Sequence, residues 1–311
     1  MNTQNNKNDV GAQNNRNQND NAQNEAEKSA SRKQSESKSE NKRRTAYLCV
    51  IGAVVLMLAA YEFFIGGRGK NAVVSSGVDA IITRILGSVA AALLVRYLGY
   101  RVTGKVPLRG LITALPCFIV ALCNPPILSL IVKKSSLDVA GLPLAGYIIL
   151  FAAECFFVAL FEELLFRGAV FLTLLENRRA NGKQIFVAVI LSSAIFGLTH
   201  LLNLFSGFSG AVFLQVGYSF LLGGICAFTL LCTKNIFCAT AVHAVFNFCG
   251  QLVERFGHGE WATIGIMAFT VCLGVCTAAF VIFKFLRFSK ADTENFYVLS
   301  AAETPRRNAG K

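Results

Sequence analysis

Polar and apolar residues separate along this chain into one long polar stretch and a series of apolar runs. Residues 1–44 are rich in Asn, Gln, Ser and Lys and contain almost no large apolar side chain, so they cannot bury enough surface to offset the entropy of folding. The pattern predicts a disordered polar tail. The eight apolar segments that follow predict transmembrane helices; they are 45–66, 78–100, 109–133, 139–174, 184–205, 211–232, 236–254 and 261–287.

Two of these segments depart from a simple crossing. The sequence CNPP at 123–126 should break or kink the third, because proline removes a helical hydrogen bond and restricts the residue before it. The fourth segment is too long for one crossing and predicts a re-entrant or broken portion, or a helix that runs past the membrane surface. The expected fold is an all-α polytopic transmembrane helical bundle with about eight spans.

Composition strengthens the membrane interpretation, since 54% of the residues are hydrophobic and 15% are charged. The net charge of +12 is carried mostly by the tails and by the short segments between apolar runs, as in loops that obey the positive-inside rule. We therefore expect a lipid bilayer, and no nucleic acid, as a partner. An even number of spans with basic tails predicts an integral, multi-pass protein of the cell membrane with both termini in the cytoplasm.

The stretch FEELLFRG at 161–168 places three charges inside an apolar region. Each charge costs about 2.5–3.5 kcal/mol at membrane depth, so such residues usually belong to a working site. On a helix, Glu163 and Arg167 share a face, whereas Glu162 is rotated by roughly 140° from the arginine. Glu163 is expected to pair with Arg167, which leaves Glu162 as a candidate base. The alternative is a structural ion network that contains all three.

Two histidines in other apolar segments complete a set of polar residues. Phe196 and His200 are four residues apart, as are His243 and Asn247, so each pair shares a helical face. Either histidine alone could be a core residue that bonds across helices. Together with Glu162, however, they place proton-handling groups on three helices at membrane depth.

Three motifs in this order, EExxxR at 162–167, FxxxH at 196–200 and HxxxN at 243–247, resemble the CAAX-prenyl protease and bacteriocin-processing (CPBP, or Abi) family of intramembrane proteases. FRG after the paired glutamates and the stretch 215–224 are similar too, and the likeness spans about 140–255. The resemblance implies an endopeptidase that hydrolyses a peptide bond. Its implied catalytic residues are Glu162 and His200, which activate water, and His243 and Asn247, which stabilise the oxyanion, with Glu163, Arg167 and Phe196 in support.

The apolar pattern and the resemblance together suggest a domain organisation, in which the resemblance concerns the catalytic core alone. The polar tail at 1–44 precedes N-terminal transmembrane helices at 45–135, a catalytic helical core at 136–256, and a last transmembrane helix with a basic C-terminal tail at 257–311. The implied partner is a peptide or protein substrate that is membrane-associated or lipidated. The family's roles leave CAAX-type processing, bacteriocin or other peptide processing, and self-immunity open.

A zinc site is the alternative to a metal-free mechanism. Two histidines and one glutamate with a vacant position are a common ligand set for catalytic zinc, and Glu162, His200 and His243 would supply it. The chain lacks HExxH, and asparagine is an unusual partner for zinc. We therefore favour a glutamate mechanism without a cofactor.

Other functions fit parts of this pattern. A non-catalytic membrane scaffold or immunity protein of the same fold could use the polar residues only to specify helix arrangement, and a proton-coupled transporter could use them as a relay. The chain shows no internal repeat of the kind many transporters have, which disfavours the transporter. We expect Gly217, Gly223 and Gly224 to permit close helix packing. Tyr218 and Gln215 could line a cavity, but core packing with a hydrogen bond between helices is the favoured role.

Overall fold

The structure is a computed structural model that describes residues 52, 72–137, 144–176, 182–206, 208–260 and 262–288. The chain divides into two compact units, Met1–Ala60 and Tyr61–Lys311, and the elements below all belong to the second. The predicted tail at 1–44 and the first predicted span at 45–66 lie outside the described residues, apart from Gly52.

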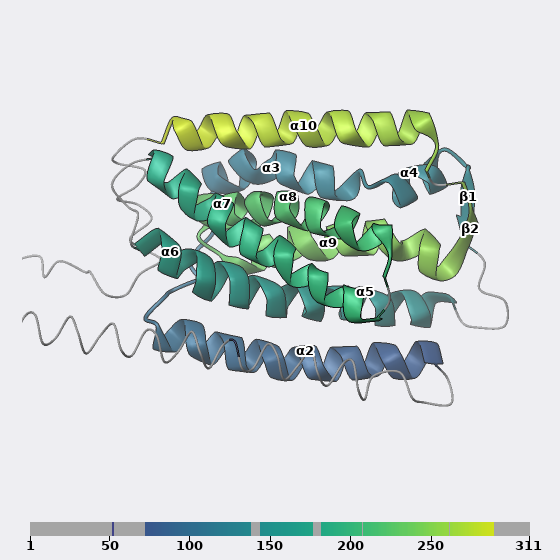
Figure 1. Ribbon diagram of the computed structural model, residues 1–311, viewed down its shortest axis with the longest axis horizontal. Coiled ribbons are helices and arrows are strands. Elements are labelled where there is room, and N and C mark those ends of the chain that lie inside the picture. The colour runs from purple at the N-terminus through teal and green to yellow at the C-terminus, as the bar shows by residue number, and fades with distance from the viewer. Residues whose placement is uncertain are drawn as a thin grey trace, which may run out of the picture. The chain divides into compact units, whose positions relative to one another are not determined.

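Helices make up nearly all of the described structure, which confirms the all-α class (Figure 1). In chain order they are α2 (Ala72–Tyr97), α3 (Leu108–Leu122), α4 (Pro125–Ile131), α5 (Leu144–Glu163), η1 (Leu164–Phe171), α6 (Leu172–Glu176), α7 (Gly182–Thr199), η2 (His200–Ser206), α8 (Gly210–Thr233), α9 (Ile236–Phe256) and α10 (Ile264–Leu286). Two short strands, β1 (Ser135–Leu137) and β2 (Gly257–Gly259), form an antiparallel pair.

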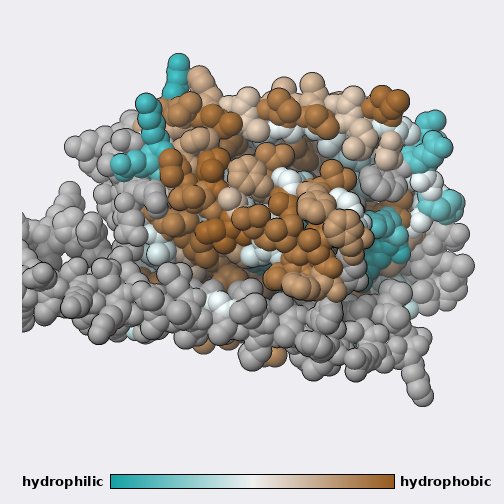
Figure 2. All heavy atoms as spheres, in the orientation of Figure 1, coloured by the Kyte–Doolittle hydropathy of each residue, from teal (hydrophilic) through white to brown (hydrophobic). Residues whose placement is uncertain are grey.

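Five helices in the described part of the chain are long and apolar enough to cross a membrane, and a bent pair of helices would make a sixth span. The five are Gly77–Tyr97, Gly182–Phe205, Gly210–Thr233, Ile236–Phe256 and Ile264–Leu286. Each coincides with one of the predicted segments. Figure 2 shows apolar residues across the middle of the visible face, with hydrophilic residues mostly toward its ends, as expected for an integral multi-pass membrane protein.

The predicted break at 123–126 is confirmed. The helix α3 ends at Leu122, α4 begins at Pro125, and the two are bent by 73°. Pro125 and Pro126 occupy the first positions of α4, where the missing backbone N–H would have no helical partner in any case. Asn124 before them is extended, with φ −70° and ψ 144°, as the proline ring requires of its neighbour.

The long fourth segment is interrupted by a change of helix type. The α-helical hydrogen-bond pattern of α5 ends at Glu163, η1 is a π-helix, and α-helical geometry returns at Leu172. A π-helix bonds i to i+5 and is often found at functional sites. The sequence predicted an interruption in this segment but not its kind, and the charged motif lies where the pattern changes.

Helices α7 and α8 pack closely because glycines face the neighbouring helix. A Cβ on Gly197 would lie 2.9 Å from the carbonyl oxygen of Val216, and one on Gly223 would lie 2.9 Å from the side chain of Ser193. The role predicted for Gly223 is thus confirmed. The role predicted for Gly217 is wrong, since a Cβ there would meet nothing within 4 Å.

The helix α9 is anchored at both ends. At its start, the side chain of Asn235 accepts a hydrogen bond from the N–H of Phe237 at 2.9 Å and donates one to the carbonyl oxygen of Gly104 at 2.8 Å. At its end the chain passes directly into β2, which pairs with β1. These contacts fix the helix that carries the third motif.

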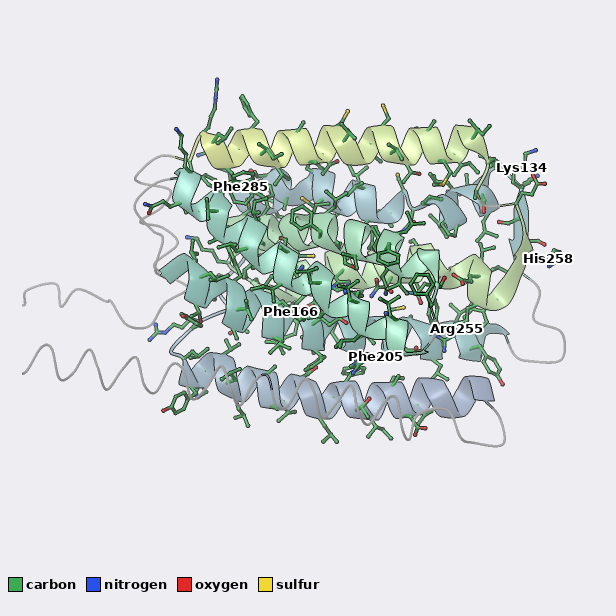
Figure 3. All side chains as sticks on the ribbon, viewed as in Figure 1. Lys134, Phe166, Phe205, Arg255, His258 and Phe285 are labelled. Atoms are coloured by element: carbon green, nitrogen blue, oxygen red, sulfur yellow. The ribbon has the colours of Figure 1, made fainter. Side chains whose placement is uncertain are left out.

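An ion pair joins α5 to α9 near the strand end of the bundle. The guanidinium of Arg255 contacts both carboxylate oxygens of Glu154 at 2.9 Å, and it lies 4.9 Å from the ring centroid of Phe151. Figure 3 shows Arg255 and His258 toward this end, whereas Phe166 lies nearer the middle of the helices.

Candidate active site

A buried chain of charged and polar groups links η1, α5 and α9. Nη1 of Arg167 lies 3.2 Å from Oε1 of Glu163, and the same oxygen lies 2.9 Å from Nδ1 of His243. Because an ionised carboxylate only accepts, Nδ1 of His243 is the donor. All three side chains are buried, so the arginine offsets the desolvation of Glu163 as the sequence predicted.

Glu162 lies at the other nitrogen of the same imidazole. Its Oε2 is 3.5 Å from Nε2 of His243. The side chain of Glu162 is 19% exposed, whereas that of Glu163 is fully buried. The two adjacent carboxylates therefore differ in environment: Glu163 is enclosed and paired, while Glu162 is partly exposed.

Phe196 lies between the two histidines and the arginine. Its ring centroid is 5.0 Å from that of His200 and 5.8 Å from that of His243, both in edge arrangements. The guanidinium carbon of Arg167 lies 4.2 Å from the same ring, and the ring of Phe166 packs at 4.9 Å. Since Phe196 is 1% exposed, its ring fixes the spacing of these groups.

His200 is the first residue of η2, where α7 ends. Its Nδ1 lies 3.1 Å from the carbonyl oxygen of Phe196, and its Nε2 lies 3.5 Å from the hydroxyl of Ser219. A carbonyl oxygen only accepts, so Nδ1 carries the hydrogen, and Nε2 of the neutral ring is an acceptor. This ring is partly buried, and in its neutral form Nε2 presents a lone pair rather than a hydrogen.

Asn247 lies one helical turn beyond His243 on α9 and is partly exposed. At this level α9 is held by Asn124, whose side-chain N–H donates to the carbonyl oxygen of Phe246 at 3.1 Å. Gly250 allows the approach, because a Cβ there would lie 2.8 Å from the Asn124 amide. The break in the α3–α4 pair thus supports the helix that carries His243 and Asn247.

A zinc site would need several donor atoms that lie close together. In the described part of the chain, the group of His, Cys, Asp and Glu donors that lie within 4.8 Å of one another is Glu163, Cys226 and His243; neither Glu162 nor His200 belongs to it. In that group, Oε1 of Glu163 already contacts the cationic Arg167, which would repel a metal ion. The donor atoms of Glu162, His200 and His243 are not gathered into one such group in the described part of the chain.

Sequence reasoning missed several residues of this region. Cys226 is fully buried beside Glu163 and His243, and its thiol lies 3.7 Å from the carbonyl oxygen of Ala239. A cysteine in an apolar segment carries no signal that separates this position from ordinary packing. Ser219 has a weak signal, because it lies four residues after Gln215 on the same face of α8.

Residues 144–249, about one third of the chain, match the family described as Type II CAAX prenyl endopeptidase Rce1-like. This match confirms the resemblance indicated by the three motifs. The match contains every candidate site residue. It implies protease activity and a peptide or protein substrate, and it supports a CAAX-type intramembrane protease in general. No curated protein and no solved structure matches the chain.

Proposed function

We propose that this protein is an intramembrane endopeptidase in which Glu162 and His200 activate a water molecule that attacks a substrate peptide bond. The observation that carries the proposal is the difference between the adjacent carboxylates. Oε1 of Glu163 is shared by Arg167 and His243 in a fully buried position, while Glu162 is partly exposed beside the second nitrogen of the same ring. Of these two carboxylates, only Glu162 combines partial exposure with contact to a proton-handling group.

His200 serves as the second proton acceptor in this proposal. Its Nδ1–H is committed to the carbonyl oxygen of Phe196, which leaves the Nε2 lone pair for a water proton. Glu162 and His200 together accept one proton from the attacking water, and the resulting hydroxide adds to the carbonyl carbon of the substrate. The proton is returned to the leaving amine as the peptide bond breaks, so acid and base roles belong to the same pair.

His243 and Asn247 stabilise the oxyanion that forms on the carbonyl of the substrate. With Nδ1–H donated to Glu163, a proton at Nε2 makes His243 a cationic donor on the side where Glu162 lies. Asn247 adds an amide N–H from the same face of α9. Donors of this kind are stronger in a site shielded from bulk water.

The proposed reaction needs no metal or other cofactor. The proposed substrate is a peptide or protein presented at the membrane, with a C-terminal lipidated cysteine motif as the first class to test, because the matching family is described as a CAAX prenyl endopeptidase. Processing of other peptides is the second class. The basic tails favour a cell-membrane protein with both termini in the cytoplasm.

The test uses the full-length protein in lipid nanodiscs with two fluorogenic peptides, one ending in a farnesylated CAAX motif and the other lacking the lipid. We expect cleavage of the lipidated peptide by wild type and its loss in Glu162→Gln. The control Glu260→Gln changes an exposed glutamate outside the helices and should retain activity. Near-wild-type turnover by folded Glu162→Gln would overturn the assignment of the base.

A further inference from the structure

Three residues on one face of α8 meet three residues of α7 and η2 in order. Gln215, Ser219 and Gly223 are spaced by four, so they follow one another along a helical face. The residues opposite them are Asn203, His200 and Ser193, respectively. Because the two helical segments run in opposite directions, the three contacts form a ladder across the interface.

Two rungs of this ladder hold the backbone segments at a defined separation. At one end, Gly223 lies so close to Ser193 that an added Cβ would be 2.9 Å from its side chain. At the other end, Asn203 donates a side-chain hydrogen bond to Oε1 of Gln215 at 2.8 Å, which also confirms the hydrogen bond between helices predicted for Gln215. The middle rung, Ser219 and His200, is therefore fixed from both sides.

The contact between Ser219 and His200 has a defined donor and acceptor. Nε2 of His200 is an acceptor because Nδ1 carries the hydrogen toward the carbonyl oxygen of Phe196. The hydroxyl of Ser219, which is 2% exposed, is consequently the donor across the 3.5 Å contact. With both ring nitrogens engaged, the imidazole is held in one tautomer and one orientation.

We propose that Ser219 is a positioning residue for His200, and that the hydrogen bond between Asn203 and Gln215 holds the η2 turn in place for this contact. The inference rests on the proposed function in assigning His200 a role with water. At 3.5 Å the contact is at the long limit for a hydrogen bond, so it orients the resting ring, and a water molecule at normal distance can take its place at Nε2.

The kinetic test compares Ser219→Ala with Ser193→Ala. The two changes remove the same hydroxyl from the same interface, but the hydroxyl of Ser193 has no hydrogen-bond partner among the described residues. We expect Ser219→Ala to lower kcat by about threefold to tenfold with little change in KM, as loss of one neutral hydrogen bond does. Ser193→Ala should leave both constants unchanged. Equal effects of the two variants would overturn the proposal.

A second measurement does not depend on turnover. The sequence has three histidines, so ¹⁵N-histidine labelling gives a simple imidazole spectrum in which His200→Gln identifies the His200 signals. Ser219→Ala should shift the Nε2 resonance of His200, and Ser193→Ala should not. Ser219→Cys, which keeps the approximate volume but donates weakly, should shift it in the same direction.

The two measurements distinguish a failure of the positioning role of Ser219 from a failure of the proposed peptidase function. An Nε2 resonance that is unchanged in both Ser219→Ala and Ser219→Cys would overturn the positioning role, whatever the activity. If Ser219→Ala shifts the Nε2 resonance of His200 but the wild-type protein cleaves neither peptide, the contact would be supported and the proposed peptidase function would be overturned.

Discussion

The guanidinium of Arg167 lies over the ring of Phe196, with its carbon 4.2 Å from the ring centroid. The same cation lies 3.2 Å from Glu163. The ring of Phe196 also makes T-shaped contacts with the rings of His200 and His243. Arg167 therefore has two functions in the structure. It offsets the buried charge of Glu163, and it packs on the aromatic ring that spaces the two histidines.

Replacing Arg167 by methionine should strongly destabilise the protein, because Glu163 would be left as a buried charge without its cation. The expected loss in free energy of unfolding is about 3–5 kcal/mol. Adding Glu163→Gln to Arg167→Met should recover part of it, since the unpaired charge is then removed. Glu163→Gln alone should reduce stability more than turnover. Thermal unfolding in detergent, followed by circular dichroism, measures all three.

A matched control is Arg287→Met. The guanidinium of Arg287 also lies over an aromatic ring, Phe283, at 4.4 Å, but that ring is half exposed. Its loss should change stability by about 0.5–1 kcal/mol. If Arg167→Met and Arg287→Met changed stability equally, the buried ion pair of Arg167 with Glu163 would add nothing to stability beyond a contact between a cation and a ring.

Asn247→Ala should lower kcat by about 10²–10³ with little change in KM, because one oxyanion donor is lost. Asn247→Asp should be at least as damaging, since it replaces the donor with a group that accepts when ionised. Steady-state kinetics on the cleaved peptide provide the measurement. A change confined to KM would mark Asn247 as a substrate-binding residue instead.

Gly197→Ala should destabilise the α7–α8 interface by about 1–3 kcal/mol, because the new Cβ would meet the backbone oxygen of Val216 at 2.9 Å. Gly217→Ala on α8 is the matched control. Nothing lies within 4 Å of the added methyl group there, and alanine favours the helix by up to about 1 kcal/mol. Opposite signs in the unfolding midpoint are expected; two stabilised variants would contradict the close packing at Gly197.

Activity should survive a strong chelator. The mechanism proposed for Glu162 and His200 acts directly on water, so metal analysis and activity should be uncorrelated across preparations treated with EDTA or phenanthroline. Reversible loss of activity that only zinc restores would contradict the metal-free mechanism. In that case, Cys226→Ser would show whether the ion is held by Glu163, Cys226 and His243, since a ligand change there should lower the bound zinc.

Much of the arrangement was predictable from spacing along the chain. Apolar runs located the helices, the prolines at 125 and 126 located the break between α3 and α4, and the four-residue spacing of Glu163 and Arg167 predicted their ion pair. Such predictions succeed because they concern one helix at a time, where geometry is fixed by the helical repeat.

Contacts between helices were harder to predict. The sequence motifs predicted that Glu162 and His200 activate water together. In the structure, however, the carboxylate of Glu162 contacts His243. Which faces meet depends on the rotation of each helix about its axis, and rotation is set by packing of many small contacts rather than by any motif. The π-helix adds to this, because no residue in 164–171 signals an i to i+5 pattern.

The π-helix η1 sets the rotation of the following helix, α6, about the helix axis. Its i to i+5 hydrogen bonds widen each turn, so every residue of Leu164–Phe171 rotates the chain by less than a residue of an α-helix does. Deleting one residue from this segment would let α-helical pairing resume, but it would rotate α6 away from its contacts with α7. The motif is therefore sensitive to length as well as to composition, and a one-residue deletion there should be more harmful than most substitutions.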